Sequence, residues 1–174
     1  LDSYFMDKEI PYESQEAVNI TYNSFKWVKE SAVKASIDLG TERGEAPDMV
    51  GTGRRNSHLL AVAPTATNST IAGGITPALE KRFKNIFPQK TKSGTFEVIE
   101  PAVIRVLNRH GLNTPETIKF IKDNKGSVQN VDGLTELEKL YLRTAFETDQ
   151  MWVVEHAAAA QESVCQAVST NLFI

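Results

Sequence analysis

Hydrophobic and polar positions along the chain predict a mainly helical protein with few strands. Between Ser14 and Gly40, apolar and small side chains recur at alternating steps of three and four, which places them on one face of a helix. Ser14 is a suitable N-cap and Gly40 a suitable stop, so we expect a helix over residues 14–40. Trp27 lies near the edge of the stripe and is expected at the rim of the core. The expected buried stripe consists of Val18, Thr21, Phe25, Val28, Ala32, Ala35 and Leu39.

A second apolar pattern, the run Leu59–Ala63, ends abruptly at Pro64 and predicts a buried strand. A glycine-rich polar loop over residues 40–53 leads into it, and Arg55 and Asn56 come just before it. A buried arginine at that place has to be paired, so we expect Arg55 to hold a carboxylate or to tune a neighbouring anion site.

The residues that follow Pro64 are small hydroxyl and amide residues, over positions 65–70. Small side chains leave backbone N–H groups uncovered, and hydroxyls add donors that rotate toward an oxyanion. If a helix begins here, its free N–H groups and its dipole favour a phosphate. The alternative is a capped helix start that binds nothing. The segment near 64–70 is therefore the candidate phosphate loop.

The remaining pattern predicts a strand over residues 96–99, and Thr114 and Thr135 have the sequence context of helix N-caps. The four alanines at 157–160 allow tight helix packing. We interpret residues from about 101 to 148 as a helical surface insert. Helices are expected over 102–108, 116–122, 136–146 and 152–161, and a buried final strand over 171–174.

Composition limits the possible functions. The chain has 174 residues, no visible repeat and no low-complexity linker, so we expect residues 1–174 to form a single unit. With a net charge of −3 and no basic stripe, direct nucleic-acid binding is not expected, and Lys81–Lys84 is interpreted as a solvated helix face and loop. There is no apolar run of the roughly 20 residues that a membrane helix needs, and no signal sequence. We expect a cytoplasmic protein that binds no membrane.

Thiol and imidazole chemistry is sparse. Cys165 is the single cysteine, so an internal disulfide is excluded, and it is expected to be a small buried packing group rather than a redox group. The three histidines, His58, His110 and His156, are scattered and offer no metal-ligand spacing. No metal or other cofactor is expected to bind to this chain.

Several runs, in order, resemble the large, catalytic subunit of class I ribonucleotide reductases over essentially the whole chain. The strongest is the run 53–67, from Gly53 through Pro64 to Thr67. The further runs are 74–80, 85–87, 92–98 and 165–174. The resemblance implies an α/β, predominantly helical fold class, and more narrowly the C-terminal part of a ten-stranded α/β reductase barrel.

The resemblance also implies a function. Class I reductases convert ribonucleoside diphosphates to deoxyribonucleoside diphosphates by a radical mechanism. The family's substrate-diphosphate loop maps onto Thr65, Ala66, Thr67, Asn68 and Ser69. Its catalytic cysteines belong to the part of the family sequence before Leu1, and its radical-relay tyrosines to the part beyond Ile174. The chain is therefore expected to bind substrate phosphates, to hold no catalytic residue and to be inactive alone.

The partners implied by the resemblance are the remaining portion of the large subunit and a small subunit that generates the radical at a metal centre. A dithiol reductant is implied for the assembled enzyme. Two alternatives stay open. The chain can be a non-catalytic remnant or assembly module with the reductase fold, or it can be one piece of a longer or naturally split subunit, acting in the host cytoplasm if phage-encoded.

Overall fold

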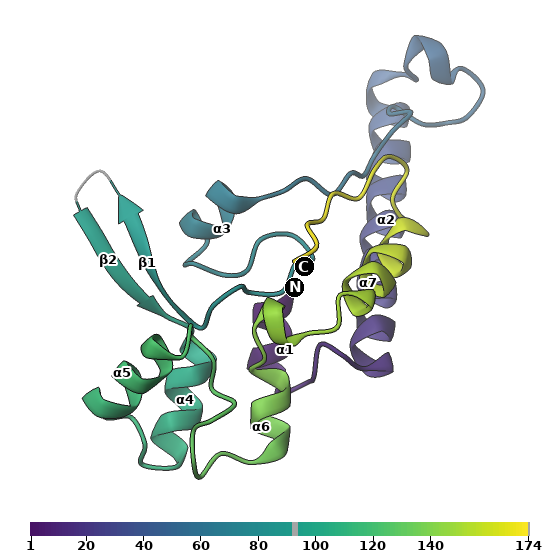
Figure 1. The fold of residues 1–174 in the computed structure, drawn as a ribbon. Helices are drawn as coiled ribbons and strands as arrows, with labels where there is room; N and C mark the ends of the chain where they lie inside the picture. The colour runs from purple at the N-terminus through teal and green to yellow at the C-terminus, as the bar shows by residue number, and fades with distance from the viewer. Residues whose placement is uncertain (92–93, 174) are drawn as a thin grey trace.

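The computed structural model describes residues 1–91 and 94–173. Figure 1 shows helix α2 as a long rod at one side of the molecule, and a β-hairpin with helices α4 and α5 at the other. Helix α3 and both chain ends lie between these two parts. The helices are α1 (Asp2–Lys8), α2 (Gln15–Arg43), α3 (Ala66–Ile71), α4 (Pro101–Arg109), α5 (Pro115–Asp123), α6 (Glu136–Tyr141) and α7 (Met151–Gln161), and the strands are β1 (Ile86–Thr91) and β2 (Gly94–Ile99).

Helix α2 begins where the sequence predicts but does not end there. The Ser14 hydroxyl accepts a hydrogen bond from the backbone N–H of Ala17 at 3.1 Å, as an N-cap does. The helix continues past Gly40 to Arg43, and Gly44 ends it with φ at 79°. Gly40 has a different role, because a Cβ atom there would lie 2.5 Å from the carbonyl oxygen of Gly53. It is a close-approach glycine rather than a helix stop.

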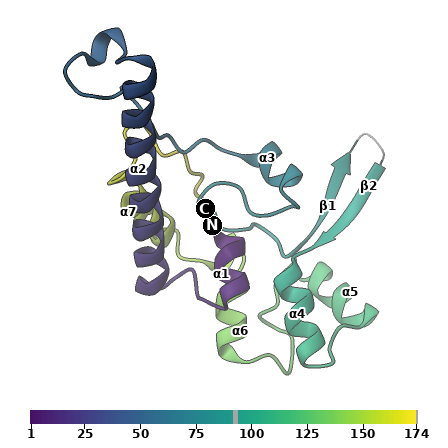
Figure 2. The same cartoon turned by 180° about the vertical axis from the view of Figure 1, so that it is seen from behind.

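The predicted stripe on α2 is buried only near the start of the helix. Val18 and Thr21 are buried, whereas Val28 is 39% exposed, and Trp27, at 69% exposed, does not lie at the rim of the core. Figure 2 shows the reason: α7 packs along part of α2, and the far part projects beyond the other elements. Spacing predicted the helix correctly, but a continuous buried stripe needs a neighbour along its whole length.

The run Leu59–Ala63 is extended but is not a strand over its length. Val62 forms one parallel bridge with Val168. The backbone N–H of Val62 donates to Ala167 at 3.0 Å, and that of Ser169 donates to Val62 at 2.9 Å. The run is half-buried or exposed. Strands of parallel sheets are buried when they have neighbours on both sides and helices on both faces, and the part of the chain that the structure describes gives this run one paired neighbour.

The predicted final strand is also wrong in this chain. Residues 171–173 have no regular secondary structure, Leu172 is 47% exposed, and Ile174 lies outside the described residues. The segment is held instead by a side chain, because the backbone N–H and the side-chain amide of Asn171 both donate to Glu80 Oε1, at 2.9 and 2.6 Å.

The expected strand over 96–99 is confirmed as the last four residues of β2. It pairs with β1 in an antiparallel hairpin whose register runs from Ile86 opposite Ile99 to Thr91 opposite Gly94. No pattern predicted β1. The family-like run 92–98 begins at Lys92 and Ser93, which lie outside the described residues.

Three of the four later helices match their predicted ranges within one or two residues, as α4, α5 and α7. The predicted helix 136–146 is interrupted: α6 ends at Tyr141, and a short 3-10 helix follows at Ala145–Glu147. The capping box between Thr135 and Glu138 is present as predicted. A second capping box, between Thr144 and Glu147, begins the 3-10 helix and explains the interruption.

The main hydrophobic core lies between the hairpin and helices α4 to α6. Met6 and Ile86 join it from outside the 101–148 segment. A smaller cluster around Phe5, Tyr12, Ala17 and Val153 connects α1, α2 and α7. The other buried residues of the main core are Ala102, Val103, Val106, Leu107, Ile121, Val128, Val131, Leu134, Tyr141 and Leu142.

Candidate functional site

The five predicted phosphate-loop residues lie together in one helical turn. Thr65 directly precedes α3, and its carbonyl oxygen accepts a hydrogen bond from the backbone N–H of Ser69 at 2.8 Å. Ala66, Thr67, Asn68 and Ser69 are therefore the first four residues of the helix. The side chains of Thr67 and Asn68 are exposed, whereas Ser69 is buried. The first backbone N–H groups of a helix have no partner within the helix, so this turn presents donors.

The end of α3 is fixed by two glycines. The backbone N–H of Gly74 donates to the carbonyl oxygen of Ser69 at 2.9 Å, the long-range bond of a Schellman motif. Gly73, with φ at 89°, takes the left-handed position that this motif requires. The turn therefore returns the chain sharply after the candidate loop.

Thr65 has a structural role that the sequence did not predict. Its Oγ1 accepts a hydrogen bond from the backbone N–H of Ala78 at 2.9 Å. Two reciprocal hydrogen bonds continue the attachment, because Ser3 N–H donates to Thr76 Oγ1 at 3.0 Å and Thr76 N–H donates to Ser3 Oγ at 2.9 Å. The segment after α3 is therefore held at one side by the loop and at the other by α1.

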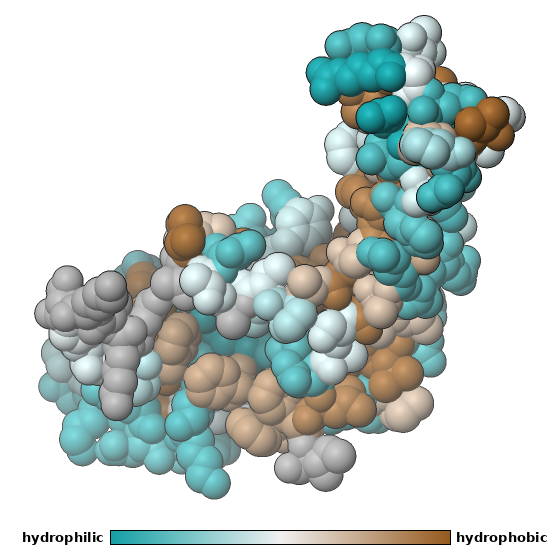
Figure 3. All heavy atoms as spheres, turned by 90° about the horizontal axis from the view of Figure 1, so that it is seen from above, coloured by the Kyte–Doolittle hydropathy of each residue, from teal (hydrophilic) through white to brown (hydrophobic). Residues whose placement is uncertain are grey.

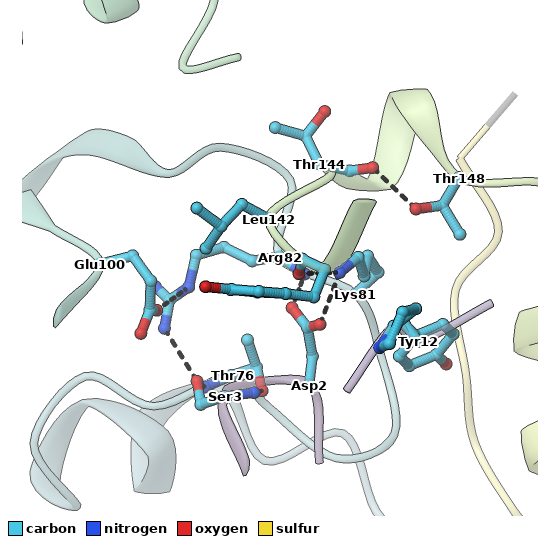
Figure 4. A network of polar contacts seen from close by, with 12 residues as sticks. Asp2, Ser3, Tyr12, Thr76, Lys81, Arg82, Glu100, Leu142, Thr144 and Thr148 are labelled. Atoms are coloured by element: carbon cyan, nitrogen blue, oxygen red, sulfur yellow. Dashed lines mark hydrogen bonds and ion pairs between the residues drawn. The ribbon is translucent and has the colours of Figure 1, made fainter. Parts of the chain in front are cut away.

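Figure 4 shows a buried network of charged side chains beneath this segment. Lys81 Nζ donates to Asp2 Oδ1 at 2.8 Å, and both side chains are almost completely buried. Arg82 donates its backbone N–H to Asp2 Oδ2 at 2.9 Å, and its Nε lies 2.7 Å from Glu100 Oε2. Burial raises the pKa of Glu100, and the Arg82 charge opposes that rise.

The interpretation of Lys81–Lys84 as a solvated helix face is therefore wrong. The segment is not helical, and Lys81 and Arg82 are 3% and 6% exposed. The two cations are buried because Asp2 and Glu100, from distant parts of the sequence, face them. A buried charge that lacks such a partner is very costly, and sequence spacing gives no sign of partners so far away.

Arg55 does not hold a buried carboxylate. Its side chain is exposed, and Nη1 donates to the backbone carbonyl oxygens of Gly44 and Glu45 at 3.2 and 3.4 Å. Asn56 is attached to α2 instead, since its backbone N–H donates to Ser36 Oγ at 2.9 Å. These contacts hold the chain just before the run 59–63, and they involve no residue of the candidate loop.

Cys165 is exposed, so the expectation of a buried packing group is wrong. Its Sγ accepts hydrogen bonds from the backbone N–H groups of Leu59 and Leu60, at 3.0 and 3.1 Å. Those two donors lower the pKa of the thiol. In residues 1–91 and 94–173, no group of three or more His, Cys, Asp or Glu side chains is placed to hold a metal ion. No helix in this part of the chain is long and apolar enough to cross a membrane.

Comparison with known proteins shows the family to which the chain belongs. A family described as the ribonucleotide reductase barrel domain matches residues 46–174. A protein of Frog virus 3 (isolate Goorha) that carries the name of a ribonucleoside-diphosphate reductase large subunit is 42% identical over 98% of this chain and 30% of its own length. The large subunit of Invertebrate iridescent virus 6 is 38% identical over 99% of this chain and 18% of its own length.

A solved structure shows the same arrangement. The class Id ribonucleotide reductase alpha subunit of Actinobacillus ureae superposes with a TM-score of 0.91 at 32% identity, over 99% of this chain and 31% of that one. The chain belongs to the ribonucleotide reductase family, within its barrel domain. It spans about a third or less of the relatives it matches. The predicted fold class, a mainly helical α/β segment of the reductase barrel, is confirmed.

Proposed function

We propose that this chain contributes the substrate-diphosphate loop of a ribonucleoside-diphosphate reductase large subunit. The observation that carries the proposal is the single helical turn formed by Thr65 to Ser69, which begins within the sequence run that resembles the family most strongly. Thr67 and Asn68 expose a hydroxyl and an amide at the start of α3. Both groups donate hydrogen bonds, as an anionic phosphate requires.

The loop would recognise charge and not the base. Backbone N–H groups, one hydroxyl and one amide are suited to phosphate oxygens, and donors to ionised groups form the stronger class of hydrogen bond. No cation from the buried network needs to reach the ligand, since Lys81 and Arg82 are already paired with carboxylates. We therefore expect ribonucleoside diphosphates with different bases to depend equally on this turn.

The chemistry of reduction would come from elsewhere in the enzyme. The proposed partners are the remaining portion of the large subunit and a small subunit that generates the radical at its metal centre, with a dithiol as reductant. The chain alone is expected to be inactive, and the place of action is expected to be the cytoplasm. The net charge of −3 supports a role that involves no direct binding of nucleic acid.

The test is a double substitution, Thr67→Ala with Asn68→Ala, in the complete large subunit. Losing two hydrogen bonds to a charged ligand should raise KM for a ribonucleoside diphosphate by roughly tenfold to a thousandfold. The matched control is Thr41→Ala on α2, whose hydroxyl donates to its own helix at Ile37. Unchanged KM and unchanged dissociation constant in the double variant would contradict the proposal.

A second function, an assembly module without a substrate role, is favoured by one observation. Helix α2 carries exposed apolar side chains, including Trp27 at 69% and Ile37 at 42%. Figure 3 shows hydrophobic spheres among hydrophilic ones along this helix. A groove of about 490 Å³ lies between α2 and the residues after α7, lined in part by Tyr22, Val33 and Glu162. Reductase activity recovered on adding the remaining large-subunit portion, and lost in the loop variant, would exclude this alternative.

A further inference from the structure

We propose that Arg82 is a positioning residue that holds the diphosphate loop in its binding geometry by a hydrogen bond to the carbonyl oxygen of Gly74. The inference rests on the proposed function of the loop and adds a residue that does not itself contact substrate. Arg82 is 6% exposed, so its guanidinium lies within the protein.

Arg82 joins parts of the chain that are distant in sequence. Its Nη2 donates to the carbonyl oxygen of Gly74 at 2.6 Å, while its Nε forms the ion pair with Glu100 at the start of α4. Its backbone is also held, because its N–H donates to Asp2 and its carbonyl oxygen accepts from Ala145 N–H at 2.8 Å. Figure 4 shows the guanidinium between Glu100 and Ser3, to whose Oγ its Nη2 also donates at 3.4 Å.

Gly74 connects this anchor to the loop. The same residue whose carbonyl oxygen accepts from Arg82 donates its N–H to Ser69, the last residue of the proposed binding turn. Only one residue therefore separates the Arg82 guanidinium from the loop. A shift of the Gly74 peptide would displace the end of α3 directly.

The described residues of helix α3 add nothing to the hydrophobic core. Ile71 is 82% exposed, and among the described residues neither hydrophobic cluster includes a residue of α3. Polar attachments lie at both of its ends: Thr65 to Ala78 at its start and Gly74 to Arg82 beyond its end. Mutating either attachment should move the loop more than it unfolds the core.

The position requires arginine rather than a positive charge alone. A guanidinium is planar and presents donors in several directions, so it reaches Glu100 and Gly74 at the same time. A lysine ammonium on a flexible stem would satisfy one of these acceptors and lose the other. Arg82→Lys should therefore not restore the binding geometry.

The experiment compares Arg82→Gln and Arg82→Lys in the complete large subunit, with Thr67→Ala/Asn68→Ala as the loop variant. Val103→Ala, a truncation in the main core, serves as the control for lost stability. For each variant, the dissociation constant of a ribonucleoside diphosphate is measured by calorimetry, together with KM, kcat and Tm. We expect both Arg82 variants to weaken binding roughly tenfold, with KM rising in parallel and kcat within roughly twofold.

The outcomes separate the two proposals. If Arg82→Gln lowers Tm as Val103→Ala does and both bind the diphosphate normally, while the loop variant binds weakly, Arg82 is only structural and the inference is overturned. If the loop variant binds normally, the proposed function itself fails. If Arg82→Gln does not fold, Arg82→Lys decides: weakened binding in a folded protein supports the inference, and normal binding overturns it.

Discussion

Removing the Asp2 carboxylate should be one of the most destabilising single changes in this chain. Asp2 is completely buried, and it accepts from Lys81 Nζ at 2.8 Å and from the backbone N–H of Arg82 at 2.9 Å. Asp2→Ala leaves the Lys81 ammonium, with a side chain 1% exposed, opposite an apolar methyl group. The ammonium then keeps the carbonyl oxygen of Tyr141, 3.3 Å away, as a partner.

Breaking a buried ion pair by removing one partner costs about 3–5 kcal/mol. Asp2→Asn keeps acceptor capacity and should cost less. The double variant Asp2→Ala with Lys81→Met removes both charges and should recover much of the loss, since replacing both partners by apolar groups is often close to neutral. The exposed pair of Asp38 and Lys34 is the control: Asp38→Ala should change stability by at most about 0.5 kcal/mol.

Urea unfolding followed by circular dichroism measures these differences, and hydrogen exchange of the α1 amides shows whether the loss is local. The free energy of unfolding should be lowest for Asp2→Ala, intermediate for the double variant and close to that of the parent protein for Asp38→Ala. A free-energy loss for Asp2→Ala below about 1 kcal/mol, or a double variant that is less stable than Asp2→Ala alone, would refute it.

Three further predictions follow from single residues. Burial lowers the pKa of His156, whose Nε2 donates to the carbonyl oxygen of Tyr12. The free energy of unfolding should therefore decrease as the pH falls below about 6.5, by at most about 1.4 kcal/mol per pH unit. A His156→Gln variant with the same pH profile would argue against this. Gly40→Ala should destabilise despite the better helix propensity of alanine, because its Cβ would meet the carbonyl oxygen of Gly53, and thermal unfolding checks the sign. The rate of Cys165 alkylation by iodoacetamide should reach half its maximum at a lower pH than the rate for a free cysteine. The same pH dependence as a free cysteine would show that the two N–H donors do not stabilise the thiolate.

Local signals in the sequence predicted local structure well. Ser14, Thr114 and Thr135 all cap helices as expected, because a hydroxyl and the backbone N–H three residues later are enough to form the cap. For the candidate loop a helix start was one possibility, and the structure shows that α3 begins there. The resemblance to the reductase family then predicts a diphosphate as the ligand of that turn.

Features that depend on distant partners could not be predicted in the same way. Lys81 and Arg82 look like surface residues in sequence, and only the fold brings Asp2 and Glu100 to them. The run 59–63 was expected to be buried from its apolar composition, but burial of a parallel strand requires neighbours that composition does not specify. Arg82 was not predicted to hold the loop for the same reason, because the segment Lys81–Lys84 was expected to face solvent.

The central claim is that the turn from Thr65 to Ser69 binds the phosphates of the substrate. The most direct measurement is a structure of the complete large subunit with a bound ribonucleoside diphosphate. The account predicts phosphate oxygens within hydrogen-bond distance of the backbone N–H groups at the start of α3 and of the Thr67 or Asn68 side chain. A diphosphate bound at another place in the barrel, with this turn unliganded, would contradict it.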